Sequence, residues 1–246
     1  MIDQSAYAQV ARAAVERVLS VERNAVARAG RVVFDGLRAG GVLQAFGTGH
    51  SRSVALELVG RAGGLVPVNQ LGIRDVAYYG DASPRDILDP KIEREPGLAR
   101  RIWELADIRP QDVFVIISNS GGNAAIVEMA RLATERGHPM IAITSRTHTA
   151  EVAAPQRLAD LADVVIDNGA PYGDATLPLP GGGAVCPVSN LTGVLIAQLL
   201  VAEVAGHFLA AGETPPVFRS ANTPGGDAYN DGLLETYGRR VRLGDA

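Results

Sequence analysis

Two short segments of this chain place glycine beside hydroxyl and amide side chains, each directly after an apolar run. The first consists of Gly47, Thr48, Gly49, His50 and Ser51, and the second of Ser118, Asn119, Ser120, Gly121, Gly122 and Asn123. Glycine lets the backbone turn sharply and approach a ligand. Hydroxyl groups donate to phosphate oxygens, and a helix that follows adds free N–H groups and the positive end of its dipole. The two segments therefore predict a phosphate-binding site.

The type of phosphate is restricted by what the segments lack. Neither is followed by the Gly-Lys-Ser/Thr of a Walker A loop, and neither has the third glycine of a dinucleotide-binding fingerprint. A monophosphate ester fits better than a nucleoside triphosphate. An alternative remains open, because Ser120 or Asn123 could simply cap a helix while the glycines make the turn. The presence of two such turns on two different strands favours the ligand.

The elements that must position these turns alternate along the chain. Apolar runs predict strands, and amphipathic stretches between them predict helices. The expected strands are 42–46, 65–69, 112–118, 140–144 and 163–167, and the expected helices are 3–38, from 51 onward, 97–107, 123–136, 155–161 and 189–211. This alternation predicts an α/β fold, a three-layer αβα sandwich around a five-stranded parallel sheet. Ligands bind beyond the carboxyl ends of such strands, where both turns fall.

The chain divides into three expected parts. Residues 1–40 form an N-terminal helical segment that Gly30 could bend or break, 41–211 form the phosphate-binding domain, and 212–246 form a polar tail. Pro67 predicts that the second strand lies near an edge or begins there. The long irregular stretch 72–96, with Arg74, Asp75 and Tyr78, is expected to act as a lid.

Composition excludes several partners. A net charge of −4, no basic run and only 5% aromatic residues argue against nucleic acid. The lone Cys186 forms no internal disulfide, and the N-terminus does not resemble a signal peptide, so we expect a cytoplasmic protein.

The apolar stretch 191–211 is interrupted by Gln198, Glu203 and His207, which are costly in lipid. We interpret it as a buried helix that could lie at a subunit interface and expect no membrane contact.

The second turn resembles a known phosphate loop. Residues 118–123 are similar to the Ser-x-Ser-Gly-x-Thr loop of the sugar isomerase (SIS) domain, with Asn123 in place of threonine. Residues 47–51 resemble the first loop of that family, residues 140–145 also match it, and the resemblance covers about residues 35–210. The tail resembles a bacterial branch related to phosphoheptose isomerase. The resemblance implies a dimeric αβα protein in which Ser51, Ser118, Ser120 and Asn123 contact the phosphate of a sugar.

Isomerising a sugar phosphate through an enediol requires a base near neutrality and a group that polarises the carbonyl. Glu57 is the first candidate base, because its Glu-Leu-x-Gly context resembles that of the catalytic glutamate in phosphoheptose isomerases. The alternative is a surface ion pair between Glu57 and Arg61. His50 lies within the first loop and could assist. Ser189 and Asn190 open the last long helix, where ligand contact and capping are both possible.

Three functions remain open from the sequence. The first is an aldose–ketose isomerase, the second a sensor that binds a phosphosugar without converting it, and the third an etherase or lyase acting on an amino-sugar phosphate. No cofactor is expected. Glu203 and His207 have the i,i+4 spacing of metal ligands, but no third ligand can be named, so no metal is expected either.

Overall fold

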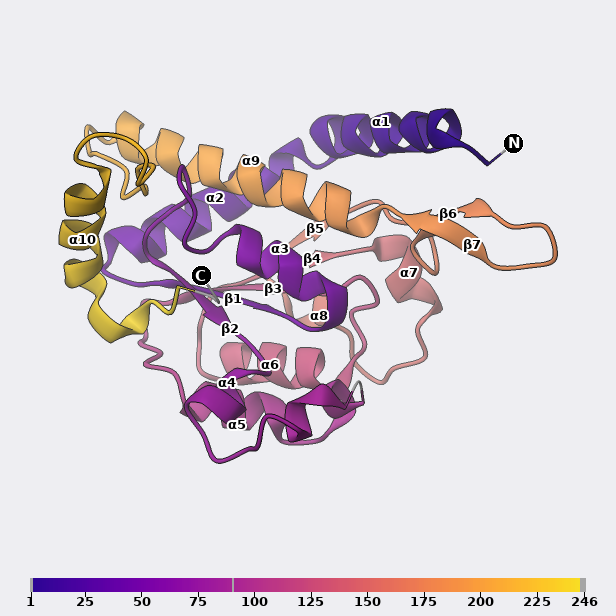
Figure 1. Cartoon of the computed structure of the whole chain (residues 1–246), viewed down its shortest axis with the longest axis horizontal. Coiled ribbons are helices and arrows are strands. Elements are labelled where there is room, and N and C mark those ends of the chain that lie inside the picture. The colour runs from indigo at the N-terminus through magenta and orange to yellow at the C-terminus, as the bar shows by residue number, and fades with distance from the viewer. Residues whose placement is uncertain (1, 90, 244–246) are drawn as a thin grey trace.

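A five-stranded parallel sheet forms the centre of the computed structural model, which describes residues 2–89 and 91–243. The strands lie in the order β2-β1-β3-β4-β5 (Figure 1). Their bounds are β1 Leu43–Gly47, β2 Val68–Leu71, β3 Val113–Ile117, β4 Met140–Thr144 and β5 Val164–Asp167. The predicted α/β class and five-stranded sheet are confirmed. β2 is an edge strand, as Pro67 indicated.

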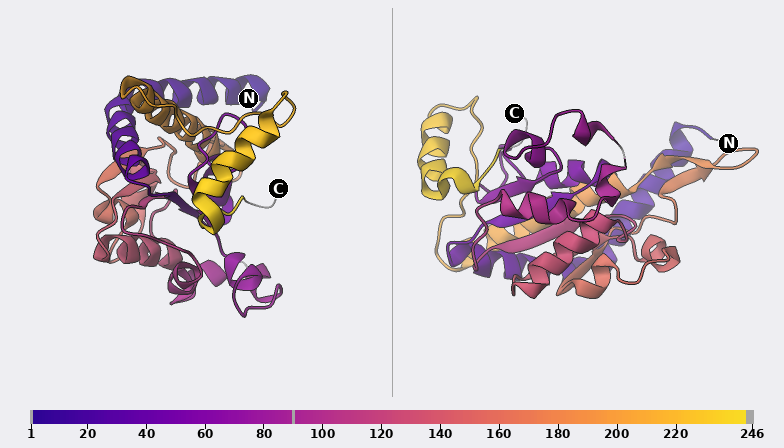
Figure 2. Two further views of the ribbon diagram at one scale, coloured as in Figure 1. Left: turned by 90° about the vertical axis from the view of Figure 1, so that its left-hand side faces the viewer. Right: turned by 90° about the horizontal axis from the view of Figure 1, so that it is seen from below.

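Helices cover both faces of the sheet and create two hydrophobic cores (Figures 1 and 2). Side chains alternate between the cores along each strand, so that in β3 Val115 faces one core while Phe114 and Ile116 face the other. One face carries α2 Arg23–Arg38, α3 Arg52–Glu57 and α9 Ser189–Ala210, and the other carries α5 Leu98–Glu104, α6 Ala124–Glu135 and α8 Leu158–Leu161. Continuous apolar strands are therefore explained by burial on both sides.

The N-terminal segment forms two helices rather than one. α1, Gln4–Val21, ends at Glu22, and α2 begins at Arg23. The Glu22 carboxylate accepts a hydrogen bond from the backbone N–H of Asp167 at the end of β5, at 3.2 Å. Gly30 lies inside α2 and allows close packing, since a Cβ there would lie 2.5 Å from the Cβ of Glu203. The break expected at Gly30 was therefore misplaced, because a tertiary contact fixes it at Glu22.

Several expected loops contain additional elements. α4 Asp75–Tyr78 and two short 3₁₀ turns lie within 72–96, and α7 Arg146–Glu151 follows β4. The segment 169–188 forms an antiparallel hairpin of β6 Ala175–Pro178 and β7 Ala184–Pro187. β2 begins three residues later than expected, because Leu65 instead pairs with Val217.

The C-terminal tail forms helix α10, Gly226–Tyr237, and then returns to the sheet. There Arg240 contacts the buried carboxylate of Asp112, which also accepts from Gln44 Nε2 at 2.8 Å. The backbone N–H of Arg242 donates to Asn69 Oδ1 at 3.0 Å. The tail thus completes a buried polar cluster. The division of the chain into three domains stays a prediction.

Within the described part of the chain, α9 alone is long and apolar enough to cross a bilayer, judged by length and composition. Its best 18-residue window has a mean hydropathy of 1.7, and 39% of that window is buried in the protein. A core helix of a globular domain meets the same criteria, and α9 packs on α2 and α3 as part of one hydrophobic core.

Candidate functional site

The two glycine-containing turns lie side by side. β1 and β3 are neighbouring parallel strands, and Gly47 at the end of β1 pairs with Ile117 at the end of β3. The segments 47–51 and 118–123 therefore leave the same edge of the sheet from adjacent strands. This is the edge where parallel sheets bind ligands.

The second turn presents its donors without capping the helix that follows. Ser118 is buried, and its Oγ accepts a hydrogen bond from Gly121 N at 3.1 Å, with Gly121 at φ 65°. Asn123 is the N-cap residue of α6, yet its side chain makes no capping bond. Its Nδ2 donates instead to Glu93 Oε1 at 3.0 Å. Ser120 is half-buried, and its hydroxyl has no hydrogen-bond partner among the residues the structure describes. The first turn of α6 keeps its N–H groups available for an anion.

Asn119 serves a different purpose within the same segment. Its Nδ2 lies 3.0 Å from His148 Nδ1, and its Oδ1 accepts from Asn168 Nδ2 at 3.1 Å. His148 in turn packs edge-on against Tyr172. These contacts join the turn after β3 to the ends of β4 and β5. Asn119 therefore braces the loop on the side away from β1.

A cavity of about 800 Å³ opens beside the first turn. Gly47, Thr48, Gly49 and His50 line one wall, and Asn190 at the start of α9 lies on it as well. The opposite wall comes from the long segment 72–96, including Asp89 and Glu93. This volume suits a small metabolite. Glu93 joins the cavity to the second turn through its bond to Asn123.

The two candidate catalytic residues are separated. His50 is exposed in the cavity, and its backbone oxygen accepts from Ser53 Oγ at 2.7 Å. Glu57 lies outside the cavity lining, where it pairs with Arg61 and accepts from Gln198 Nε2 at 2.7 Å. Ser53 and Glu57 are four residues apart on the face of α3 that contacts α9, and Glu57 lies one turn beyond the cavity lining.

The remaining predicted contacts are also divided. Asn190 lines the cavity and donates to Ser53 Oγ at 3.1 Å. Ser189 is bound to Asp174, whose carboxylate accepts from Ser189 Oγ at 2.5 Å and from Ser189 N at 2.8 Å. Ser51 is half-buried in a 3₁₀ turn and does not line the cavity. Asp174 therefore caps α9, and Ser189 takes part in this cap and does not line the cavity.

The cavity contains charged residues that the motifs did not indicate. Arg52 and Arg74 line it together with Asp89 and Glu93. One indication of these residues was present in the sequence, the unusual length of the irregular segment 72–96, which contributes Arg74, Asp89 and Glu93. Near its base, burial raises the pKa of Asp75, although Gly72 N and Arg242 both favour the charged form. No cluster of three or more His, Cys, Asp or Glu side chains suited to a metal ion occurs among the described residues.

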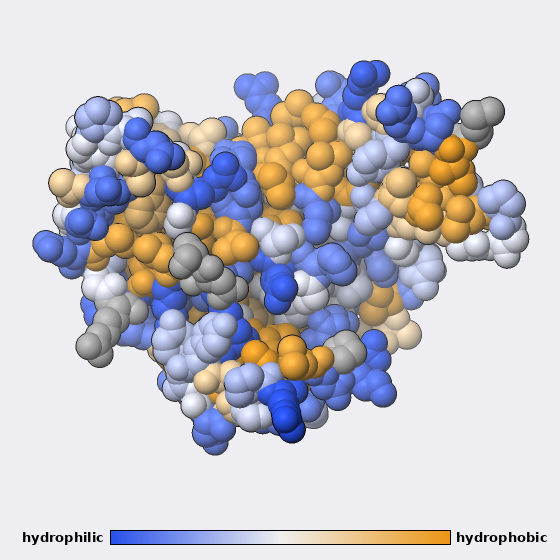
Figure 3. All heavy atoms as spheres, in the orientation of Figure 1, coloured by the Kyte–Doolittle hydropathy of each residue, from blue (hydrophilic) through white to orange (hydrophobic). Residues whose placement is uncertain are grey.

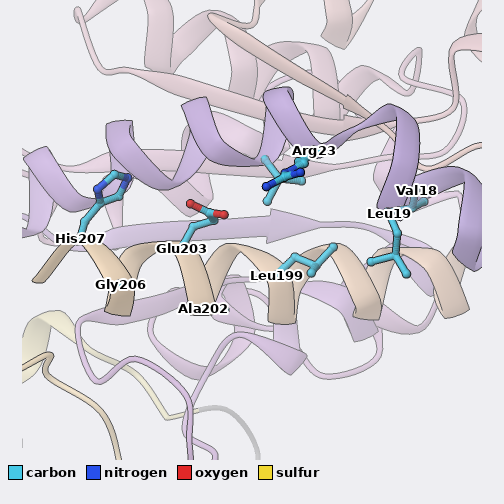
Figure 4. Close-up of a pocket in the computed structure, with 9 residues that line it drawn as sticks. Val18, Leu19, Arg23, Leu199, Ala202, Glu203, Gly206 and His207 are labelled. Carbon is cyan, nitrogen blue, oxygen red and sulfur yellow. The ribbon is translucent and has the colours of Figure 1, made fainter. Parts of the chain in front are cut away.

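A second hollow, about 420 Å³, lies between α9 and the junction of α1 and α2. Figure 4 shows Arg23 and Glu203 on opposite sides of it, with His207 at one end. The His207 Nε2 atom is buried without a hydrogen-bond partner in the described residues. Glu203 and His207 are thus remote from the glycine turns, and their surroundings are largely apolar.

Known proteins resemble this chain over most of its length. A UPF0309 protein of Listeria monocytogenes serotype 4b is 34% identical over 234 residues, which is 93% of both chains. Among solved structures, a phosphoheptose isomerase from Francisella tularensis superposes with a TM-score of 0.53 at 17% identity, covering 81% of this chain and 95% of that one. The Vibrio vulnificus NanR protein complexed with ManNAc-6P gives a TM-score of 0.50 at 16% identity, covering 94% and 66%. These structural similarities concern the fold.

The family assignment follows from the sequence match. Residues 6–145 match the family described as SIS domain, which is more than half of the chain and includes both glycine turns. The chain therefore belongs to the SIS domain family.

Proposed function

We propose that this protein binds a phosphorylated sugar and interconverts its aldose and ketose forms. The observation that carries the proposal is the uncapped N-terminus of α6, which leaves donors free beside Ser118 and Ser120. A phosphate there would receive hydrogen bonds from the two hydroxyls, from Asn123 and from backbone N–H groups. The neighbouring cavity has room for the sugar chain and presents His50. The names of relatives with this fold, such as phosphoheptose isomerase, support the same ligand class.

The reaction needs groups that move protons between adjacent carbons and their oxygens. His50 is suited to exchange protons with the sugar oxygens, since it lies in the cavity wall and is exposed. Glu57 was the base indicated by sequence resemblance, and its bonds to Arg61 and Gln198 hold it outside the cavity lining. Using Glu57 as the base would require α3 or its neighbours to rearrange.

A non-catalytic sensor is the second candidate. The separation of Glu57 from His50 favours it, as does the similarity of fold to NanR, which was solved with a sugar phosphate bound. A sensor would bind sugar phosphates without exchanging a carbon-bound proton. The etherase alternative would release lactate from a muramyl sugar phosphate.

We also propose a cytoplasmic homodimer that associates through α9. Hydrophobic residues surround α9 rather than occupying one face, and such a helix is normally buried all round. Leu191 and Leu209 nevertheless remain 39% and 66% exposed. Figure 3 shows hydrophobic surface over this helix. A second copy would cover this surface and the groove of Figure 4.

Substitution of Ser120 tests the phosphate site. Ser120→Ala removes one hydroxyl without disturbing a hydrogen bond within the described protein, and Ser20→Ala on α1 is the control. A hydrogen bond to a charged group contributes about 1.5 kcal/mol or more, so we expect at least about tenfold weaker binding. Calorimetry with a panel of sugar phosphates measures this effect. Equal affinities for Ser120→Ala and the wild type would contradict the proposed site.

Proton exchange with deuterated water tests catalysis. NMR should detect loss of the C2 proton signal for at least one sugar phosphate that binds. Binding without exchange or product would exclude the isomerase and favour the sensor.

A further inference from the structure

Glu93 places a carboxylate between the two glycine turns. Its Oε1 is fixed by Asn123 Nδ2 at 3.0 Å, at the start of α6. Its Oε2 points toward the first turn, 3.8 Å from where a Cβ on Gly49 would lie. Because Gly49 has no side chain, a ligand can approach the carboxylate from that direction. Glu93 therefore spans the space that connects the predicted phosphate site with the cavity.

The other acidic residues near the cavity are less suited to contact a sugar. Glu57 does not line the cavity. Asp89 lines it, but its Oδ1 accepts from Lys91 N at 2.8 Å and stabilises its own loop. Glu93 is half-buried, is held at one oxygen, and keeps the other toward the cavity. Among described residues, it alone combines a fixed carboxylate with a position between both turns.

We infer that Glu93 is the base of the isomerisation and that Asn123 orients it, an assignment that rests on the proposed function. Asn123 Nδ2 has two hydrogens, so one can bind Glu93 while the other faces a phosphate. Anchoring one carboxylate oxygen restricts the side chain and directs the other oxygen to the substrate. The departure from threonine at this position of the loop then has a chemical role.

The proton transfers balance with His50 as the partner of Glu93. Glu93 takes the proton from C2 of the open-chain aldose, and the C–H electron pair becomes the C1–C2 double bond. The carbonyl electrons move to O1, which receives a proton from the His50 imidazolium. His50 then takes the O2 proton as the ketone forms, and Glu93 returns its proton to C1. Both residues end in their starting states.

The test compares two substitutions that remove the same charge from the same loop. Glu93→Gln removes the base, and Glu95→Gln is the matched control, because Glu95 is exposed and does not line the cavity. Glu57→Gln examines the rival residue. Loss of a general base lowers rates by about 10²–10⁴-fold. We expect such a fall in C2 exchange for Glu93→Gln alone, with sugar-phosphate affinity nearly unchanged. Thermal melting verifies that each variant is folded.

A second measurement separates chemistry from structure. Glu93→Ala should regain part of its exchange activity when formate is added, because a small carboxylate can occupy the vacated space. Full activity in Glu93→Gln, or an equal loss of affinity and exchange, would overturn the assignment while leaving the isomerase intact. A wild-type protein that binds sugar phosphates without exchanging C2 would overturn the isomerase proposal, and the role of Glu93 with it.

Discussion

Replacing Arg240 with methionine should destabilise the fold, because it leaves a buried carboxylate without its cation. The side chains of Arg240 and Asp112 are 6% and 0% exposed, and they form an ion pair at the amino-terminal edge of the sheet, where Asp112 precedes β3. Asp112 also accepts hydrogen bonds from Val42 N at 2.9 Å, Gln44 Nε2 at 2.8 Å and Arg109 N at 3.1 Å. These three donors would remain in the variant and offset part of the loss.

The expected magnitude follows from that balance. Breaking a buried ion pair costs about 3–5 kcal/mol, and the remaining donors place Arg240→Met near the lower value, about 3 kcal/mol. For a chain of this size each kcal/mol lowers the melting temperature by about 2–4 °C, so we expect a decrease of about 6–12 °C. Differential scanning calorimetry at neutral pH measures it.

Two further variants make the measurement decisive. Arg109→Met removes an exposed guanidinium that pairs with Asp107 and should leave the melting temperature essentially unchanged. Arg240→Met combined with Asp112→Asn should cost less than the sum of the single changes, since no buried charge is left unpaired. If Arg240→Met melted at the same temperature as the wild type, the tail would not be part of the cooperative fold, and the buried ion pair would not contribute to stability as expected.

Two other changes test packing and pH dependence. Gly30→Ala should lower the free energy of unfolding by about 1–3 kcal/mol, because the added methyl group overpacks against Glu203. A methyl group added at Gly232 on α10 meets no atom within 4 Å, so Gly232→Ala should be neutral or stabilising in chemical denaturation. Equal effects of the two substitutions would contradict the close approach of α2 and α9. Burial raises the pKa of Asp75, so the folded state holds this proton more tightly than the unfolded state, and stability falls as pH rises from the unfolded value through the raised one. Asp75→Asn should therefore gain stability relative to the wild type as pH increases from about 4 to 7, and a constant difference in urea unfolding across that range would contradict the shift.

The sequence predicted the sheet well because its signal is local. Each strand is a short apolar run, and burial on both faces removes the need for alternation. The missed elements depend on contacts distant in sequence. α7 begins where Ser145 Oγ accepts from His148 N, and Ser145 in turn donates to Ala170 O at 2.6 Å. The β6–β7 hairpin contains a non-glycine residue with positive φ, Cys186, and no residue pattern indicates this conformation.

The candidate site, like the fold, was predictable only where the signal is local in the sequence. Two turns on two strands were sufficient to predict a shared edge, because parallel strands direct their carboxyl ends the same way. The position of Glu57 depended instead on its contact with Gln198 of α9, a residue 141 positions away in the sequence. Glu93 carried no motif at all. Its contact with Asn123 joins residues 30 positions apart through a loop whose path only the folded structure reveals.

The C-terminal tail and the long segment 72–96 meet at Asp75, and this contact bears on how the cavity could open. Arg242 lies 3.4 Å from Asp75 Oδ2, and the same oxygen accepts from Gly72 N at 3.1 Å. The base of the segment is thus attached to the body of the protein by a buried ion pair. Its far end is held by the hydrogen bond from Asn123 to Glu93 and by Ile92, which is buried in the core beside α5 and α6. A neutral-to-carboxylate hydrogen bond between half-buried groups is weaker than a buried charge pair with several partners. Of these two polar attachments the one at Glu93 is the weaker, so we expect any opening of the segment to begin there.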